Sequence, residues 1–192
     1  MSRVAQIVAA AGGDTAYTID QSVIFDRLNT NYGSGSPRLT RSISSTGNRR
    51  KFTFSCWVKR SRLNSDFTSW EAQGIMGTSH GSWSTDTFFL FDFLNDTDQI
   101  RIYGAAEILK TNRRFTDTGG WMHIVLAIDT EQSTASNRML LYIKGVEETS
   151  FATHNVAQNT DLAMNNSTSS NEMHIATNGY DTGNGPYPYD GY

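Results

Sequence analysis

The sequence predicts an all-β fold, a sandwich of two antiparallel sheets that follows a short N-terminal arm. The prediction depends on two segments far apart in the chain, 51–61 and 119–151, which alternate apolar and polar side chains with a period of two. That period is typical of a strand with one face in a core. The composition agrees, because aromatic residues reach 11% while charged residues make up only 18%, as in a turn-rich β protein rather than a disordered chain.

The N-terminal arm is predicted over residues 1–20, ahead of a sandwich over residues 21–192. Apolar residues of the arm follow helical spacing until Gly12, and a helix this short is marginal alone. We therefore expect an anchor that docks on a neighbouring subunit or another protein, the alternative being a disordered terminus. The anchor residues are Val4, Ile7 and Val8.

The first strands of the sandwich are expected at 22–25 and 38–42, with a loop rich in Gly, Ser and Asn between them. Segment 51–61 then predicts a strand that holds the single cysteine, Cys56, in the core. One cysteine allows no intrachain disulfide, so folding does not depend on an oxidising compartment. The inward face of this strand comprises Phe52, Phe54, Cys56 and Val58, and the outward face Thr53, Ser55, Trp57 and Lys59.

The middle of the chain alternates short predicted strands with polar loops. Strands are expected at 75–78, 87–94, 100–103 and 107–111. Segment 87–94 is apolar at nearly every position, so we expect its strand to be buried on both faces. The Asn-Asp-Thr-Asp sequence at 95–98 predicts a turn.

The second long segment, 119–151, predicts three strands. A polar turn follows the first strand, a strand at 139–144 returns to Gly145, and 146–151 is expected to complete a tight hairpin. A loop-rich stretch and a late strand at 172–176 come next. In the first strand the inward face comprises Met122, Ile124, Leu126 and Ile128, and the outward face Trp121, His123, Val125, Ala127 and Asp129.

Three short motifs in these strands resemble the laminin-G-like, concanavalin-A-like jelly-roll family. Its patterns are F-T-x-S-x-W-V-K, W-x-H-x-V and L-Y-x-N-G-V, and the chain departs from the last one at Lys144, where the family often has Asn. The resemblance covers roughly residues 20 to 192 and implies a jelly roll. The matching residues are Phe52, Thr53, Ser55, Trp57, Val58 and Lys59; Trp121, His123 and Val125; and Leu141, Tyr142, Gly145 and Val146.

The amino-acid sequences of segments 44–61 and 129–146 look similar to those of jelly-roll modules in tail-fibre and virion structural proteins of marine bacteriophages. This resemblance implies a non-catalytic virion protein, a tail fibre, appendage or decoration module, that sits in the virion. Its partners would be other virion proteins and further copies of itself, and a host surface glycan is a possible ligand. The alternative is a free carbohydrate-binding module, secreted or on a cell surface.

Several other functions lack their sequence signals. The net charge of −3 argues against nucleic-acid binding. The cluster Arg49, Arg50 and Lys51 and the pair Arg113 and Arg114 are interpreted as solvated loop charges. No run of apolar residues is long enough to span a membrane. The E-x-D-x-x-E run of some glucanases on this fold is missing, and Glu147 and Glu148 are adjacent, so they point to opposite faces of a strand. We expect no enzyme, no catalytic residues and no cofactor, calcium aside.

Two binding sites are weighed against structural roles for the same residues. Aromatic residues in loops and in the tail are candidates for glycan binding, the alternative being that they cap the sandwich or fill a subunit interface: Trp70, Trp83, Tyr180 and Tyr187. Oxygen-bearing residues are candidates for a calcium site, the alternative being ordinary turn chemistry: Asp92, Asn95, Asp96 and Asp98.

The last residues of the chain, Tyr189 to Tyr192, resemble the start of the strand that closes the sheet in this family. A sheet without that strand has an open edge with unpaired backbone groups. We therefore expect the sandwich to continue beyond residue 192 in a longer chain, or another chain to supply the strand.

Overall fold

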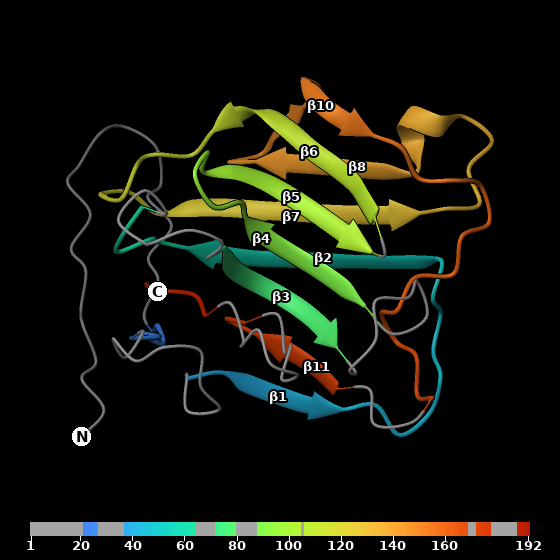
Figure 1. Ribbon diagram of the computed structural model, residues 1–192, viewed down its shortest axis with the longest axis horizontal. Helices are drawn as coiled ribbons and strands as arrows, with labels where there is room; N and C mark the ends of the chain where they lie inside the picture. The colour runs from blue at the N-terminus through green and yellow to red at the C-terminus, as the bar shows by residue number, and fades with distance from the viewer. Residues whose placement is uncertain are drawn as a thin grey trace.

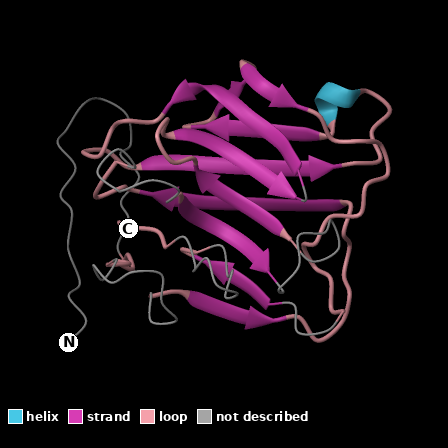
Figure 2. Ribbon diagram, in the orientation of Figure 1, coloured by secondary structure: helices cyan, strands magenta, loops and turns pink. Residues whose placement is uncertain are grey.

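The computed structural model describes residues 21–26, 37–63, 72–79, 88–104, 106–168, 172–177 and 188–192 (Figures 1 and 2). Strands dominate this part of the chain, and its only helix is the 3-10 turn Ala135–Asn137. The strands are β1 (Leu39–Ser42), β2 (Lys51–Val58), β3 (Gln73–Ser79), β4 (Phe89–Phe93), β5 (Gln99–Gly104), β6 (Ala106–Arg114), β7 (Met122–Asp129), β8 (Met139–Ile143), β9 (Val146–Glu148), β10 (Phe151–His154) and β11 (Glu172–Ile175).

The strands form two antiparallel sheets that lie one over the other. The larger sheet has seven strands in the order β1-β11-β3-β4-β5-β6-β10, and the smaller has four in the order β2-β7-β8-β9. In Figure 1, β4 and β5 pass obliquely over β2 and β7. This arrangement confirms the predicted all-β sandwich.

The core fills the space between the sheets, where the aromatic residues of β2 and β4 meet. The rings of Phe52 and Phe89 lie edge to face with their centroids 6.0 Å apart. Phe54 and Phe91 do the same at 6.1 Å. All five residues of β4 are buried, as its apolar sequence predicts. The inward faces expected for β2 and β7 are confirmed, because Phe52, Phe54, Cys56, Met122 and the buried residues Val58, Ile124, Leu126 and Ile128 pack in one cluster.

Two expected strands differ in the structure. Segment 22–25 makes only an isolated bridge, between Phe25 and Gly191. Segment 146–151 is not one strand, because β9 ends at Glu148 and Phe151 begins β10 in the other sheet. A side-chain oxygen of Glu148 accepts the N–H of Ser150 at 3.1 Å, which turns the chain between the sheets.

The hairpin between β8 and β9 closes through a two-residue turn, Lys144 and Gly145. Their φ angles are 53° and 80°. Two positive φ angles in a two-residue loop are the signature of a type I′ turn, whose twist matches that of the flanking strands. Lys144 therefore adopts the left-handed conformation that Asn accepts more easily.

Residues near the C-terminus pair with the segment that directly follows β2. Lys59 and Tyr192 exchange two backbone hydrogen bonds of 2.8 Å each. Gly191 lies between Phe25 and Arg60, with φ at 144°. A Cβ atom at Gly191 would stand 2.1 Å from the carbonyl oxygen of Lys59, so only glycine fits.

The N-terminal arm, with Val4, Ile7 and Val8, lies outside the described residues. The anchor and the division at residue 20 therefore stay predictions. Within the described ranges, no helix is long and apolar enough to cross a membrane.

Candidate functional site

The outer face of the four-stranded sheet is the most distinctive surface of the described chain, and we call it the outer surface. Side chains on this face alternate with those of the core. Register aligns them in rows across the sheet: Ala127 lies between Thr53 and Leu140, and Val125 lies between Ser55 and Tyr142. Trp57 lies beside His123. The outer surface comprises Lys51, Thr53, Ser55, Trp57, His123, Val125, Ala127, Asp129, Leu140, Tyr142 and Glu147.

One end of the outer surface carries an exposed aromatic stack. The indole ring of Trp57 and the imidazole ring of His123 lie nearly parallel, at 24°, with centroids 4.9 Å apart. A hydrogen bond of 2.9 Å joins Ser55 Oγ to His123 Nε2 and orients the imidazole. Trp57 is 40% exposed although it belongs to a regular strand. The stack therefore holds a partly exposed indole in a fixed position on a rigid sheet.

A second aromatic pair extends this end. Trp121 and His123 are two residues apart in an extended segment, so they share a face. The rings of Trp121 and Tyr192 lie 5.9 Å apart at 60°. We call Trp57, Trp121, His123 and Tyr192 the aromatic cluster. Aromatic rings beside polar groups are a usual means of holding ligands that have both apolar and polar faces.

The opposite end of the outer surface is a polar hollow of about 700 Å³ that opens to solvent. Its floor includes Ala127, whose small side chain leaves room between Thr53 and Leu140. Gln132 Nε2 donates to Asp129 Oδ2 at 2.7 Å, and this hydrogen bond lowers the pKa of Asp129. The hollow is lined by Lys51, Phe52, Thr53, Ala127, Ile128, Asp129, Gln132, Asn137, Leu140 and Glu147.

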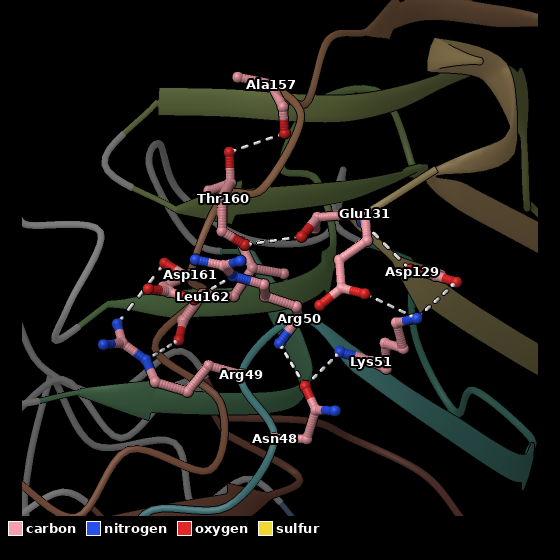
Figure 3. A network of polar contacts seen from close by, with 11 residues as sticks. Asn48, Arg49, Arg50, Lys51, Asp129, Glu131, Ala157, Thr160, Asp161 and Leu162 are labelled. Atoms are coloured by element: carbon pink, nitrogen blue, oxygen red, sulfur yellow. Dashed lines mark hydrogen bonds and ion pairs between the residues drawn. The ribbon is translucent and has the colours of Figure 1, made fainter. Parts of the chain in front are cut away.

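A polar network holds the chain beside this hollow (Figure 3). Arg49 Nε donates to the carbonyl oxygen of Leu162 at 2.7 Å, and Arg50 Nε lies 2.6 Å from Asp161 Oδ1. The Arg50 bond lowers the pKa of Asp161. Lys51 Nζ lies 2.8 Å from Glu131 Oε2. Arg49 and Arg50 thus tie the segment after β10 to the start of β2, and Lys51 ties the segment after β7 to it. The side chains of the Arg50 and Lys51 pairs remain about 37–46% exposed, in keeping with the solvated charges that the sequence predicts.

The four residues predicted to bind glycan, Trp70, Trp83, Tyr180 and Tyr187, lie outside the described residues, so that site stays a prediction. Trp57 and His123 are not among the binding residues that the sequence predicts. A signal was present, because both residues fell on predicted outward faces. Only the register between β2 and β7, which no local pattern contains, shows that the two rings meet.

In the structure, the four candidate calcium ligands take part in different hydrogen bonds and ion pairs. Asp92 is fully buried, and both its oxygens accept hydrogen bonds from Arg101, at 3.1 and 2.6 Å. Burial raises the pKa of Asp92, although Arg101 opposes the rise. Asn95 and Asp96 are joined by a side-chain hydrogen bond of 3.4 Å. In the described segments, no group of three or more His, Cys, Asp or Glu side chains is arranged to hold a metal, and the calcium site stays a prediction.

The fourth calcium candidate, Asp98, takes part in a buried arginine network. Asp98 Oδ1 lies 2.6 Å from Arg60 Nη2, and Arg60 is only 1% exposed. Arg60 also donates to the carbonyl oxygen of Phe115 at 2.6 Å and to Gln73 Oε1 at 3.2 Å. Its guanidinium lies 4.4 Å from the centre of the Phe93 ring. These contacts give Asp98 a structural role in joining the two sheets.

The outer face of the seven-stranded sheet holds a second group of charges. Arg101 pairs with Asp92, while Lys110 Nζ lies 3.0 Å from Glu107 Oε1. Burial raises the pKa of Glu107, but hydrogen bonds from Thr153 and Lys110 outweigh it, so the pKa is lowered. Each carboxylate of this group is thus already paired with a cation.

Comparison with known proteins identifies the architecture. A family model described as the concanavalin A-like lectin/glucanases superfamily matches residues 33–187. A native heptameric SAP-like pentraxin from Limulus polyphemus has a similar structure, with a TM-score of 0.54 and 13% sequence identity over 88% of this chain and 70% of the pentraxin. At that identity the likeness shows the fold alone.

A second solved structure is more distant. It is domain 4 of AbnA, a GH43 extracellular arabinanase from Geobacillus stearothermophilus, in complex with arabinotriose, with a TM-score of 0.44 and 16% identity over 83% of this chain and 65% of that domain. No curated protein matches this chain.

Proposed function

This chain belongs to the concanavalin A-like lectin/glucanases superfamily, and on that premise we propose that it binds carbohydrate without cleaving it, through the outer surface. The observation that carries the proposal is the stack of Trp57 on His123. A sugar ring has an apolar face of C–H groups and a rim of hydroxyls. The indole face suits the first, and the hydroxyl and imidazole groups beside it suit the second.

The geometry of the stack favours binding because the rings are already in place. The hydrogen bond between Ser55 and His123 and the strand pairing hold His123, and His123 in turn supports one face of Trp57. A ligand therefore orders few side chains when it binds, which lowers the entropic cost of association. A 40% exposed indole is also costly to leave in water, and a ligand that covers the exposed part would relieve this cost.

The charges of the described residues support binding rather than hydrolysis. A glycosidase uses two carboxyl groups on either side of the scissile bond, one of them free to donate a proton. On the outer face of the seven-stranded sheet, Asp92 and Glu107 are both tied to cations, and Glu172 lies 3.8 Å from His174. On the outer surface, Asp129 accepts from Gln132 and lies 3.5 Å from Lys51. This leaves Glu147 as the one carboxylate among the residues of the outer surface that is not tied to a cation.

A place in the virion of a bacteriophage is a further proposal, supported by the sequence resemblance to marine phage modules. In that setting the module would recognise a host surface glycan and would assemble with copies of itself and other virion proteins. A free secreted or cell-surface module is the alternative. Light scattering on the purified chain separates the two, because a trimer or larger assembly favours the virion role and a stable monomer favours the free module.

Binding to immobilised polysaccharides tests the proposed function. We expect Trp57→Ala to weaken binding by about tenfold or more, as for a tryptophan at the centre of an interface. The sandwich should stay folded with a melting temperature lower by only about 2–4 °C, the shift that a loss of about 1 kcal/mol causes in a domain of this size. Leu39→Ala is the matched control, because Leu39 is 54% exposed on the other sheet. Unchanged binding by Trp57→Ala rejects the outer surface as the site. Release of reducing ends from any bound polysaccharide rejects the non-catalytic role.

A further inference from the structure

A small cationic pocket adjoins the aromatic cluster. Its walls come from the end of β6, the segment leading into β7 and the hairpin turn after β8, and its volume is about 190 Å³. That volume corresponds to about six water molecules at roughly 30 Å³ each, enough for one small anionic group. The lining residues are Arg113, Arg114, Phe115, Thr116, Asp117, Gly120, Met122 and Lys144.

Positive charge dominates the pocket, with three cationic side chains against one carboxylate. Arg113 lies over the ring of Phe115, 5.0 Å from its centre, which fixes the guanidinium. Arg114 and Lys144 are exposed, and neither forms an ion pair with any residue that the structure describes. The carboxylate, Asp117, is turned to the backbone, where its Oδ1 accepts the N–H groups of Gly119 and Gly120 at 2.9 and 3.2 Å.

Backbone contacts place the pocket next to the stack. The N–H of Lys144 donates to the carbonyl oxygen of His123 at 2.8 Å. Met122, a lining residue, directly precedes His123, and Gly120 directly precedes Trp121. The left-handed conformation of Lys144 sets the position of its side chain at the tip of the hairpin. The pocket and the aromatic cluster thus share the start of β7.

We infer that this pocket binds an anionic substituent, a sulfate ester or a carboxylate, of a glycan chain that lies on the aromatic cluster. The inference deepens the proposed function and rests on it. Arginine offers planar, paired donors to such oxyanions, while lysine acts as a point charge. The ligand is therefore an acidic polysaccharide, and the pocket sets the preference for acidic over neutral chains.

The overall charge of the protein makes this preference diagnostic. The net charge is −3, so the molecule as a whole repels a polyanion and a preference for one requires a local cationic site. Attraction at an exposed site is screened by salt. Raising the ionic strength from about 0.05 M to about 0.5 M shortens the Debye length from about 14 Å to about 4 Å. Binding of acidic chains should weaken over this range, whereas stacking of neutral chains should not.

The test compares matched polymers: dextran with dextran sulfate, agarose with carrageenan, and cellulose with carboxymethyl cellulose. We expect the wild type to bind at least one acidic polymer about tenfold more tightly than its neutral partner. The double variant Arg114→Gln, Lys144→Asn should lose this preference, since Asn keeps the turn conformation. Arg41→Gln removes one exposed charge from β1 of the other sheet and should retain the preference. Sulfated and carboxymethylated polymers distinguish the two kinds of anion.

The outcomes separate the two proposals. Equal affinity for acidic and neutral polymers, or a preference that survives in the double variant, overturns the pocket and leaves the proposed function standing. Acidic polymers bound equally well by Trp57→Ala overturn the stacking surface and leave the pocket. A wild type that binds none of the six polymers overturns both.

Discussion

The imidazole ring of His123 lies beneath the indole ring of Trp57, 4.9 Å away between centroids, because the two residues are direct cross-strand partners of β2 and β7. Ser55, the residue that bonds to His123, is separated from it by 68 residues in sequence. The stack therefore exists only when the two strands pair in this register. Its formation is coupled to the sheet that supports it.

A double-mutant cycle measures this coupling directly. We expect Trp57→Ala and His123→Ala to show an interaction energy of about 0.5–1.5 kcal/mol in the free energy of unfolding, the usual range for an aromatic pair. Urea denaturation of both single variants and the double variant provides the value. Trp57 with Leu39, in the other sheet, is the control cycle and should be additive. A coupling no larger than that of the control contradicts the stack.

The buried position of Arg60 predicts a large effect of its removal. Arg60→Met leaves Asp98 buried without its partner, and we expect a loss of about 3–5 kcal/mol in the free energy of unfolding. Arg50→Met is the contrast, because the side chains of Arg50 and Asp161 are 37% and 46% exposed. An exposed pair is worth about 0–1 kcal/mol. Chemical denaturation measures both losses. Comparable losses in the two variants would show that burial does not determine how much each ion pair contributes to the free energy of unfolding.

The core predicts an order of sensitivity for two rings in contact. Phe91 is completely buried, whereas its partner Phe54 is only half-buried. Phe91→Ala should cost about 3–5 kcal/mol through lost burial and a cavity, and Phe54→Ala should cost less. Equilibrium unfolding of both variants checks the order. The reverse order would mean that Phe54 contributes more to stability than its partial exposure indicates.

The buried histidine of β11 predicts a loss of stability on mild acidification. Burial lowers the pKa of His174, against an opposing effect of Glu172, from an ordinary value of about 6.5. The unfolded chain then takes up the proton more readily than the folded one, so stability is highest above about pH 6.5 and falls as the pH drops below it. Melting temperatures between about pH 7.5 and 5 should show this fall.

A matched variant isolates that effect. His174→Gln removes the titrating group while keeping a polar side chain beside Thr40, whose Oγ1 lies 3.1 Å from His174 Nδ1. The variant should show a flatter pH dependence over the same range. Asp129 and Asp161, whose pKa values are lowered, titrate only at more acidic pH. Asp92, whose pKa burial raises, is present in both proteins, so its effect cancels in the comparison. An unchanged slope in His174→Gln would assign the fall to another group.

The sequence by itself determined the strands and their faces. Alternation along 51–58 and 122–129 is a local property, because successive side chains of a strand point to opposite sides. It correctly separated the core residues, such as Phe54 and Leu126, from outward ones, such as Trp57 and His123. The continuous apolar run of β4 likewise showed a strand buried on both faces.

Only the tertiary structure decided which outward residues meet. The stack of Trp57 on His123, the pairing of Arg60 with Asp98 and the approach of Lys144 to the start of β7 all join segments distant in sequence. The same is true of the crossing from β9 to β10, which depends on which sheet edge is free to pair. A local pattern specifies the face on which a side chain lies, whereas its neighbours depend on strand order and register, which the packing of the whole sandwich selects.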